Sequence, residues 1–154
     1  MDAEHPELDV VIRSLTTADL QRLVTMDEQI TGRSRRTWYE GKLSRALSDS
    51  DVHVSLGAER DGVLVGAMLA AVYYGEFGLP EPVAVLDTLL VDRGFARLGI
   101  GRALFEQLLR NLAALRIERL RTEVGWDDHE LVSFFASMGF TPAPRLVLEL
   151  PVEP

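Results

Sequence analysis

The run of residues from Val63 to Tyr74 contains no charged side chain, and it limits what this chain can fold into more than any other feature. The dipeptide Asp61-Gly62, typical of a tight hairpin turn, comes directly before it. In the segment Val52–Glu59 before that turn, apolar and polar residues alternate as they do in a strand. A strand that is apolar on both sides must be covered on both faces. The sequence therefore predicts a sheet with helices packed against both of its faces.

The rest of the chain supplies those helices and further strands. Apolar residues at helical spacing, flanked by capping residues and glycines, predict helices at residues 18–30, 34–47, 100–115 and 131–138. Alternating or continuous apolar segments predict strands at residues 8–13, 52–59, 63–74, 83–92, 120–124 and 146–150, the last of them at an edge. The predicted fold is one α/β (α+β) domain over residues 1–154, with a mixed, mostly antiparallel twisted sheet of six to seven strands.

The composition excludes several classes of site. There is no cysteine, so a disulfide, a thiolate metal site and a cysteinyl acyl-enzyme are all excluded. The three histidines, His5, His53 and His129, lie far apart without ligand spacing, and we expect no metal. The longest apolar run is too short to cross a bilayer, and the acidic N-terminus lacks the features of a secretory signal. We therefore expect a cytoplasmic protein with no membrane partner.

Charge is unevenly distributed along the chain. A net charge of -8 argues against a nucleic-acid partner bound through its phosphates. Between Arg93 and Arg121, however, seven arginines stand against only two acids, Glu106 and Glu118. This basic segment fits either a compact anionic ligand or a solvated helix face, and charge alone does not separate the two.

A glycine-rich stretch joins the predicted strand at 83–92 to the next helix. Gly99 and Gly101 fall where that helix starts, so the chain there can approach a ligand closely. The free N–H groups of a first helical turn, together with the helix dipole, bind phosphate, and Arg97 and Arg102 flank those amides. Leu104 excludes a dinucleotide-binding fingerprint, and no Gly-Lys-Ser/Thr triplet of a P-loop exists. The alternative is an ordinary glycine-rich helix start.

Two stretches resemble the signatures of the GCN5-related N-acetyltransferase (GNAT) family. Residues Ala96–Gly101 resemble its Q/R-x-x-G-x-G/A motif, with Ala96 in place of the first Gln or Arg. Residues Asp128–Phe140 resemble its N-x-x-A-x-x-F-Y-x-x-x-G-F motif, with Asp128, Leu131 and Phe135 in place of Asn, Ala and Tyr. With the strand order, the resemblance covers about Val52 to Leu150.

The resemblance implies an N-acetyltransferase that moves an acetyl group from acetyl-CoA to an amine by direct attack on the thioester. The acceptor is a small-molecule or peptide amine, and a homodimer is possible. By resemblance, backbone groups of Leu89, Leu90 and Val91 contact the pantetheine arm, and the last predicted helix lines the thioester. The implied cofactor-binding residues are Leu89, Leu90, Val91, Arg97, Leu98, Gly99, Ile100, Gly101, Arg102, Phe134 and Phe135. A coenzyme A-binding sensor or interaction module without turnover is the alternative function.

An amine acceptor arrives as an ammonium ion, so attack requires a base. Glu123 and Asp87 are the candidate bases, with Glu123 preferred. The alternative is a carboxylate that faces solvent or forms a salt bridge, for example with Arg121 or Arg93. Candidate proton donors to the leaving thiolate are Tyr73 and Tyr74, and the candidate acceptor pocket consists of Glu28, Trp38, Tyr39 and Trp126, with His129 near its mouth.

Overall fold

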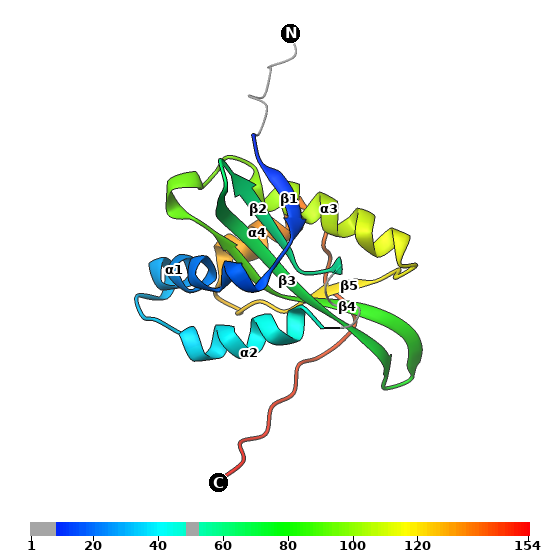
Figure 1. Cartoon of the computed structure of the whole chain (residues 1–154). Coiled ribbons are helices and arrows are strands. Elements are labelled where there is room, and N and C mark those ends of the chain that lie inside the picture. Colours follow the sequence, from blue (N-terminus) through cyan, green and yellow to red (C-terminus); the bar gives the residue numbers. More distant parts are fainter. Residues whose placement is uncertain (1–8, 49–52) are drawn as a thin grey trace. The chain divides into compact units, whose positions relative to one another are not determined.

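The computed structural model describes residues 9–48 and 53–154, which divide into two compact units (Figure 1). The first unit extends to Glu123 and contains the sheet, and the second is Val124–Pro154. The strands are β1 (Val11–Ser14), β2 (Leu56–Arg60), β3 (Val63–Glu76), β4 (Leu79–Val91) and β5 (Leu120–Thr122). They lie in the order β1-β2-β3-β4-β5, antiparallel except for the parallel pair β4–β5. The predicted mixed, mostly antiparallel sheet is therefore confirmed.

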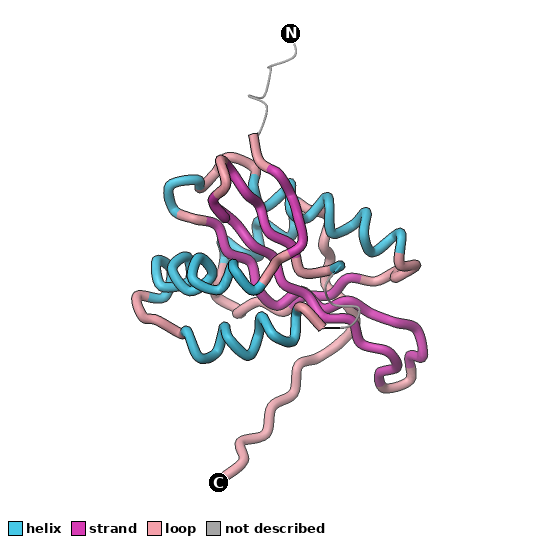
Figure 2. The backbone as a smooth tube through the Cα atoms, in the orientation of Figure 1, coloured by secondary structure: helices cyan, strands magenta, loops and turns pink. Residues whose placement is uncertain are grey.

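The hairpin of β3 and β4 forms the centre of this sheet. Its register runs from Gly66 opposite Val91 to Glu76 opposite Leu79. A loop beginning near Gly75 is expected from the sequence, and this expectation is wrong, because pairing continues to the Phe77-Gly78 turn. Figure 2 shows the tip of the hairpin projecting beyond the ends of the other strands.

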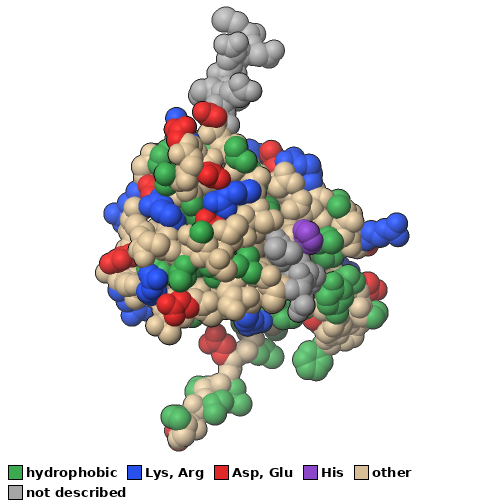
Figure 3. All heavy atoms as spheres, viewed as in Figure 1, with side chains coloured by type: hydrophobic (Ala, Val, Ile, Leu, Met, Phe, Trp, Pro, Cys, Tyr) green, Lys and Arg blue, Asp and Glu red, His purple; other side chains and the backbone are tan. Residues whose placement is uncertain are grey.

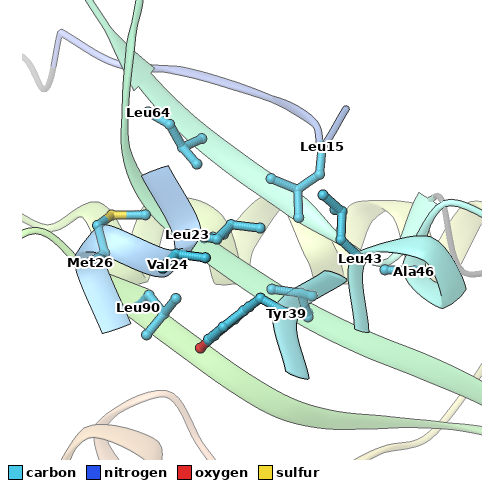
Figure 4. Close-up of a cluster of buried hydrophobic side chains, with 11 residues drawn as sticks. Leu15, Leu23, Val24, Met26, Tyr39, Leu43, Ala46, Leu64 and Leu90 are labelled. Carbon is cyan, nitrogen blue, oxygen red and sulfur yellow. The ribbon is translucent and has the colours of Figure 1, made fainter. Parts of the chain in front are cut away.

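Helices cover both faces of the sheet, as the apolar pattern of the central strand predicts. A 3-10 turn at Thr17–Asp19 leads into α1 (Leu20–Thr31), which is followed by α2 (Arg36–Ala46). These two helices lie on one face, and α3 (Ile100–Ala114) lies on the other (Figures 1 and 4). Within residues 9–48 and 53–154, no helix has the length and apolar character that crossing a membrane requires.

The core between α1, α2 and the sheet is a continuous apolar cluster (Figure 4). It consists of Leu15, Leu23, Val24, Met26, Tyr39, Leu43, Ala46, Leu64, Ala67, Leu69 and Leu90. Leu23, Met26 and Tyr39 are fully buried. Burial of a side chain of this size contributes on the order of 1.5–3 kcal/mol, so this cluster holds α1 and α2 on the sheet.

On the opposite face, Gly66 of β3 allows α3 to approach the sheet closely. A Cβ atom at this position would lie 2.7 Å from Ile100 Cγ2 and 3.3 Å from the Leu90 carbonyl oxygen. The missing side chain of Gly66 therefore makes room for Ile100, the first residue of α3, which is buried. The start of α3 is thus held directly against β3.

Two predictions about strands need correction. β2 begins at Leu56, because residues 53–55 are described and lie in no strand, and the predicted start at Val52 lies outside the described residues. The predicted edge strand at 146–150 is wrong, because Leu146, Leu148 and Leu150 are 87%, 86% and 85% exposed and lie in no strand. Alternating leucines supply an apolar face, but a strand also needs a partner for its backbone groups. The sheet of the described residues therefore has five strands instead of six to seven.

The second unit contains α4 (His129–Ser137). Asp128 caps this helix, since its Oδ1 accepts a hydrogen bond of 3.2 Å from the Leu131 N–H. The ring of Phe135 packs edge-on against Phe134 and Phe140, with centroid distances of 5.4 and 5.1 Å. The aromatic pair Phe134-Phe135 and the closing Phe140 of the second motif thus form one small aromatic cluster within this unit.

We predict that Gly66→Ala destabilises the protein by about 1–3 kcal/mol, because the new methyl group overlaps Ile100 and the backbone of β4. The matched control is Gly41→Ala in α2, where a Cβ meets nothing within 4 Å. Alanine forms helices better than glycine, so we expect the free energy of unfolding of this control to rise by about 0.5–1 kcal/mol. Urea denaturation of both variants measures the difference, and equal stabilities would contradict the close approach of α3.

Candidate functional site

The connection from β4 to α3 places backbone N–H groups at an exposed surface. Gly99 is the N-cap of α3 and adopts φ +85°, in the left-handed region that favours glycine. Its carbonyl accepts the first helical hydrogen bond, 3.0 Å from the Ala103 N–H. The N–H groups of Ile100, Gly101 and Arg102 therefore have no acceptor within the helix. They point out of the start of a helix whose dipole favours an anion.

Two arginines add positive charge to this helix start. Arg97 and Arg102 both have exposed side chains. Within residues 9–48 and 53–154, no carboxylate forms an ion pair with either guanidinium. Arg97 also adopts φ +62°, which is uncommon for a residue other than glycine. Free amides, a helix dipole and two unpaired guanidinium groups together form a site suited to a phosphate group.

Asp92 ties the beginning of this connection to α1. Its Oδ2 accepts a hydrogen bond of 2.8 Å from Arg22 Nη2, and its Oδ1 accepts one of 2.9 Å from the Gly94 N–H. Arg22 also donates through Nε to the Leu64 carbonyl at 2.9 Å. The Arg93 N–H donates to Gln29 Oε1 at 3.2 Å. The Arg22 guanidinium lowers the pKa of Asp92, so this carboxylate is charged at neutral pH.

The other half of the candidate site lies where β4 and β5 part. The parallel pairing of these strands covers only Ala84–Leu86 of β4, which continues to Val91. Directly after the paired segment, the register with β3 passes from Leu86 to Thr88, which leaves Asp87 as the extra residue of a β-bulge. The backbone edge of β4 beyond this bulge extends past the pairing with β5. An extended ligand can pair with such an edge in the manner of an added strand.

The two candidate bases lie close to this point. Asp87 is the bulge residue itself, and Glu123 follows Thr122, the residue of β5 that pairs with Leu86. Both carboxylates are exposed. The register therefore places Asp87 and Glu123 on neighbouring strands, each one residue beyond the last pair of β4 and β5.

The ion pairs of this region differ from the predicted ones. Asp87 accepts hydrogen bonds from Lys42 of α2 and, at 2.8 Å, from the Thr88 hydroxyl. Arg121 binds Glu76 through two hydrogen bonds of 2.8 and 2.7 Å. Asp87 is therefore an ion-paired carboxylate, with Lys42 of α2 as its cation instead of Arg93 or Arg121.

Tyr73 and Tyr74 lie farther out on the central hairpin. Tyr73 pairs with Val83, four residues along β3 from Leu69, which pairs with Thr88 at the bulge. At the rise of a strand this is a separation of about 13 Å. Both tyrosines are exposed, and Figure 3 shows apolar side chains gathered on the projecting hairpin. The described arrangement therefore does not bring Tyr73 or Tyr74 to the bulge.

The residues predicted for the acceptor pocket occupy different environments. Trp38 is 47% exposed, and the guanidinium carbon of Arg35 lies 5.0 Å from its ring centroid. Tyr39 is fully buried, and its hydroxyl donates to Asp27 Oδ1 at 3.0 Å. We therefore correct the prediction for Tyr39, because a side chain without exposed surface cannot line an open pocket. Glu28 is exposed on α1.

An ion pair between half-buried Arg35 and buried Asp27, which sequence reasoning missed, fixes the connection between α1 and α2. Arg35 donates to both oxygens of Asp27, at 2.8 and 2.5 Å. These bonds hold the pKa of Asp27 below its ordinary value, and burial raises the pKa of Tyr39. Nothing in the local sequence distinguishes Asp27 from an exposed helix residue. Lys42, which holds Asp87, could have been noticed from the sequence because it is the single lysine of the chain.

Trp126, His129, Phe134 and Phe135 belong to the second unit. Trp126 is 99% exposed, and His129 is exposed as the first residue of α4. Their predicted roles, in lining the thioester and bordering the acceptor pocket, remain predictions. In the described part of the chain, no group of histidine, aspartate and glutamate side chains is arranged to hold a metal ion.

Comparisons with known proteins agree with the observed fold. A family model described as "Acetyltransferase (GNAT) family" matches residues 17–140. The aminoglycoside N-acetyltransferase AAC(6')-Iy in complex with CoA matches with a TM-score of 0.76 and 17% identity, over 92% of this chain and 94% of its own. No curated protein sequence matches the chain.

Two further solved structures match at a similar level. The aminoglycoside antibiotic 6'-N-acetyltransferase AAC(6')-IG from Acinetobacter haemolyticus has a TM-score of 0.77 and 15% identity, over 94% and 99% of the two chains. A transcriptional regulator from Bacillus halodurans has a TM-score of 0.74 and 17% identity, over 93% and 98%. At these identities the similarity concerns the fold.

We predict that Asp92→Asn lowers the free energy of unfolding by about 0.5–1 kcal/mol at pH 7, because Arg22 loses its charged partner. The folded-state pKa of Asp92 is lowered, so its contribution is complete above the unfolded value of about 3.9 and is lost as the pH falls through the folded value. The difference between the two proteins should therefore narrow below about pH 4.

Urea titrations between pH 3 and pH 7 measure this difference. Glu118→Gln is the control, since Glu118 is exposed and has no ion pair within residues 9–48 and 53–154. A loss of stability for Asp92→Asn that is the same at every pH would show that the charge of Asp92 does not stabilise the connection.

Proposed function

The chain belongs to the GNAT acetyltransferase family, and we propose that it transfers an acetyl group from acetyl-CoA to an amine by direct attack on the thioester. One observation carries the proposal. A helix start at Gly99–Arg102 with free backbone amides follows, through residues 92–98, on a strand, β4, whose edge extends beyond its pairing with β5. The first feature suits the pyrophosphate of the cofactor, and the second suits its extended pantetheine arm.

The proposed cofactor site uses mainly backbone groups. Amides of residues 97–102 bind the pyrophosphate, and the guanidinium groups of Arg97 and Arg102 add charge-assisted contacts. The pantetheine arm runs along the backbone of Leu89–Val91 toward the bulge at Asp87, which leaves the thioester near the parting of β4 and β5. The solved AAC(6')-Iy structures with CoA and with a bisubstrate analogue support this choice of cofactor.

Proton transfer from the acceptor is assigned to the carboxylates at the same point. The incoming ammonium must lose a proton before its nitrogen attacks the thioester carbonyl. We propose Glu123 as the base for an external amine acceptor, because its carboxylate is exposed and no side chain of the described residues hydrogen-bonds to it. Asp87 is the second candidate and is held by Lys42 and Thr88.

The departing thiolate needs little help in this proposal. Phe135 stands where the family motif has a tyrosine, and a phenyl ring cannot donate a proton. A thiol has an ordinary pKa of about 8.5, so its thiolate is a tolerable leaving group at neutral pH. A water molecule can supply the proton afterwards.

An amine is the proposed acceptor class, with Trp38 and Glu28 as contacts on the helices of the first unit. A non-catalytic acetyl-CoA sensor is the second candidate, favoured by Phe135 and Ala96 in the two motifs. Turnover of acetyl-CoA with a panel of small amines, peptide N-termini and lysine peptides separates the two. Release of coenzyme A that depends on an amine supports the enzyme, and tight acetyl-CoA binding without release for any amine supports the sensor.

We predict that Gly101→Val weakens acetyl-CoA binding at least about tenfold, because a β-branched side chain occupies the place of the phosphate. Ala113→Val is the matched control, since it puts the same side chain at an exposed position near the other end of α3. Isothermal titration with acetyl-CoA gives the affinity, and thermal melting gives the stability. If both variants lose the same stability and neither loses affinity, the helix start is not the cofactor site.

We also predict that Phe135→Tyr leaves kcat unchanged or raises it by at most about tenfold, which is below the usual effect of a positioned acid. Phe135→Ala should act mainly through lost packing against Phe134 and Phe140. Steady-state kinetics with one competent amine, alongside melting temperatures, tests both variants. A hundredfold gain for Phe135→Tyr would show that the native chain lacks a working acid and would favour the sensor.

A further inference from the structure

Lys42 is the single lysine of this chain, which otherwise uses arginine for its basic side chains. It lies in α2, yet its ammonium reaches the sheet and donates a hydrogen bond to Asp87 Oδ2, at the β-bulge of β4. This is the place where β4 leaves its pairing with β5. The only side-chain amine of the chain is therefore held beside the proposed thioester position.

The surroundings of Lys42 fix its ammonium in place without closing it off. Its Nζ lies 5.9 Å from the ring centroid of Trp38, and the other oxygen of Asp87 accepts a hydrogen bond of 2.8 Å from the Thr88 hydroxyl. The side chains of Lys42 and Asp87 are 21% and 39% exposed. A held amine, an adjacent carboxylate and access from solvent are what an acetyl acceptor requires.

We propose that Lys42 is itself an acetyl acceptor, and that its Nζ takes the acetyl group from acetyl-CoA bound to the same chain when no external amine is present. This inference rests on the proposed function. The ammonium passes a proton to Asp87, and the neutral nitrogen attacks the thioester carbonyl. An N–C bond forms, the C–S bond breaks, and the nitrogen gives its second proton to the departing sulfur, so that an amide and the free thiol of coenzyme A result. The proton on Asp87 then passes to water.

The modification has a direct electrostatic consequence. An acetylated Lys42 is a neutral amide, so its ion pair with Asp87 is lost. The carboxylate at the bulge then lacks its cation and is available to the ammonium of another acceptor. Acetylation of Lys42 would thus change the charge at the point where we place acceptor chemistry, without altering the anion-binding start of α3.

Intact mass spectrometry of the full chain incubated with acetyl-CoA and no amine tests the proposal. The expected result is one added acetyl group, which peptide mapping assigns to Lys42 and distinguishes from the N-terminal amine. Lys42→Arg keeps a cation that can pair with Asp87 but offers no acetylatable lysine, so its internal peptide should gain nothing. The first-order rate constant should not change with protein concentration, because donor and acceptor belong to one chain.

Two controls separate an enzymatic reaction from a purely chemical one. Gly101→Val, which is expected to bind acetyl-CoA poorly, should modify Lys42 at least about tenfold more slowly. The chain unfolded in urea should show only the background rate. A rate that is equal in the native chain, in Gly101→Val and in the unfolded chain would overturn the proposal, as would a rate constant that rises in proportion to protein concentration.

The outcome also distinguishes self-acetylation of Lys42 from the proposed acetyl transfer to an external amine. If Lys42 stays unmodified in a preparation that acetylates an external amine, self-acetylation is wrong and the proposed enzyme stands. If the chain binds no acetyl-CoA and modifies no amine, both are wrong. Modification of Lys42 that stops when a good external amine is added in excess would support both.

Discussion

Everything in the first unit depends on the antiparallel pairing of β3 and β4. These two strands run alongside each other from Gly66 and Val91 to Glu76 and Leu79. β2 pairs with the outer edge of β3, β5 pairs with part of the outer edge of β4, and helices cover both faces. Because β4 is held along its length by β3, its outer edge does not need a partner everywhere. The strand is stable while part of its edge stays available to a ligand.

The bulge at Asp87 and the short length of β5 determine where the edge of β4 is unpaired. β5 ends its pairing opposite Leu86, and the bulge follows at the next residue. Two side-chain links then connect the remainder of β4 to the helices on one face. Lys42 of α2 holds Asp87, and Arg22 of α1 holds Asp92. Ion pairs with this much exposure contribute only about 0–1 kcal/mol each, so we assign them a positioning role, while the buried cluster around Tyr39 supplies the stability.

The sequence predicts elements with a strong local pattern and misses contacts made across the fold. The uncharged run after Asp61-Gly62 identifies the central strand, and the glycines at 99 and 101 identify the start of α3. The partners of Asp27, Asp87 and Asp92 are not predictable in this way, because each is 8 to 70 residues away and comes from another element or loop. The strand expected at 146–150 fails for a related reason, since alternation fixes a face and leaves the backbone partner undetermined.

An acidic chain and a polyanionic cofactor are compatible because the relevant field is local. The net charge of -8 is spread over the whole molecule, and at physiological salt a charge is largely screened beyond a Debye length of about 8 Å. At the start of α3, by contrast, the proposed site has amides and the guanidinium groups of Arg97 and Arg102 in direct contact with the phosphate. Contacts at hydrogen-bond distance outweigh distant screened repulsion, and the backbone amides keep their partial charge at every pH. Of the basic segment between Arg93 and Arg121, Arg97 and Arg102 therefore dominate the potential around the start of α3, whereas Arg121 is paired with Glu76.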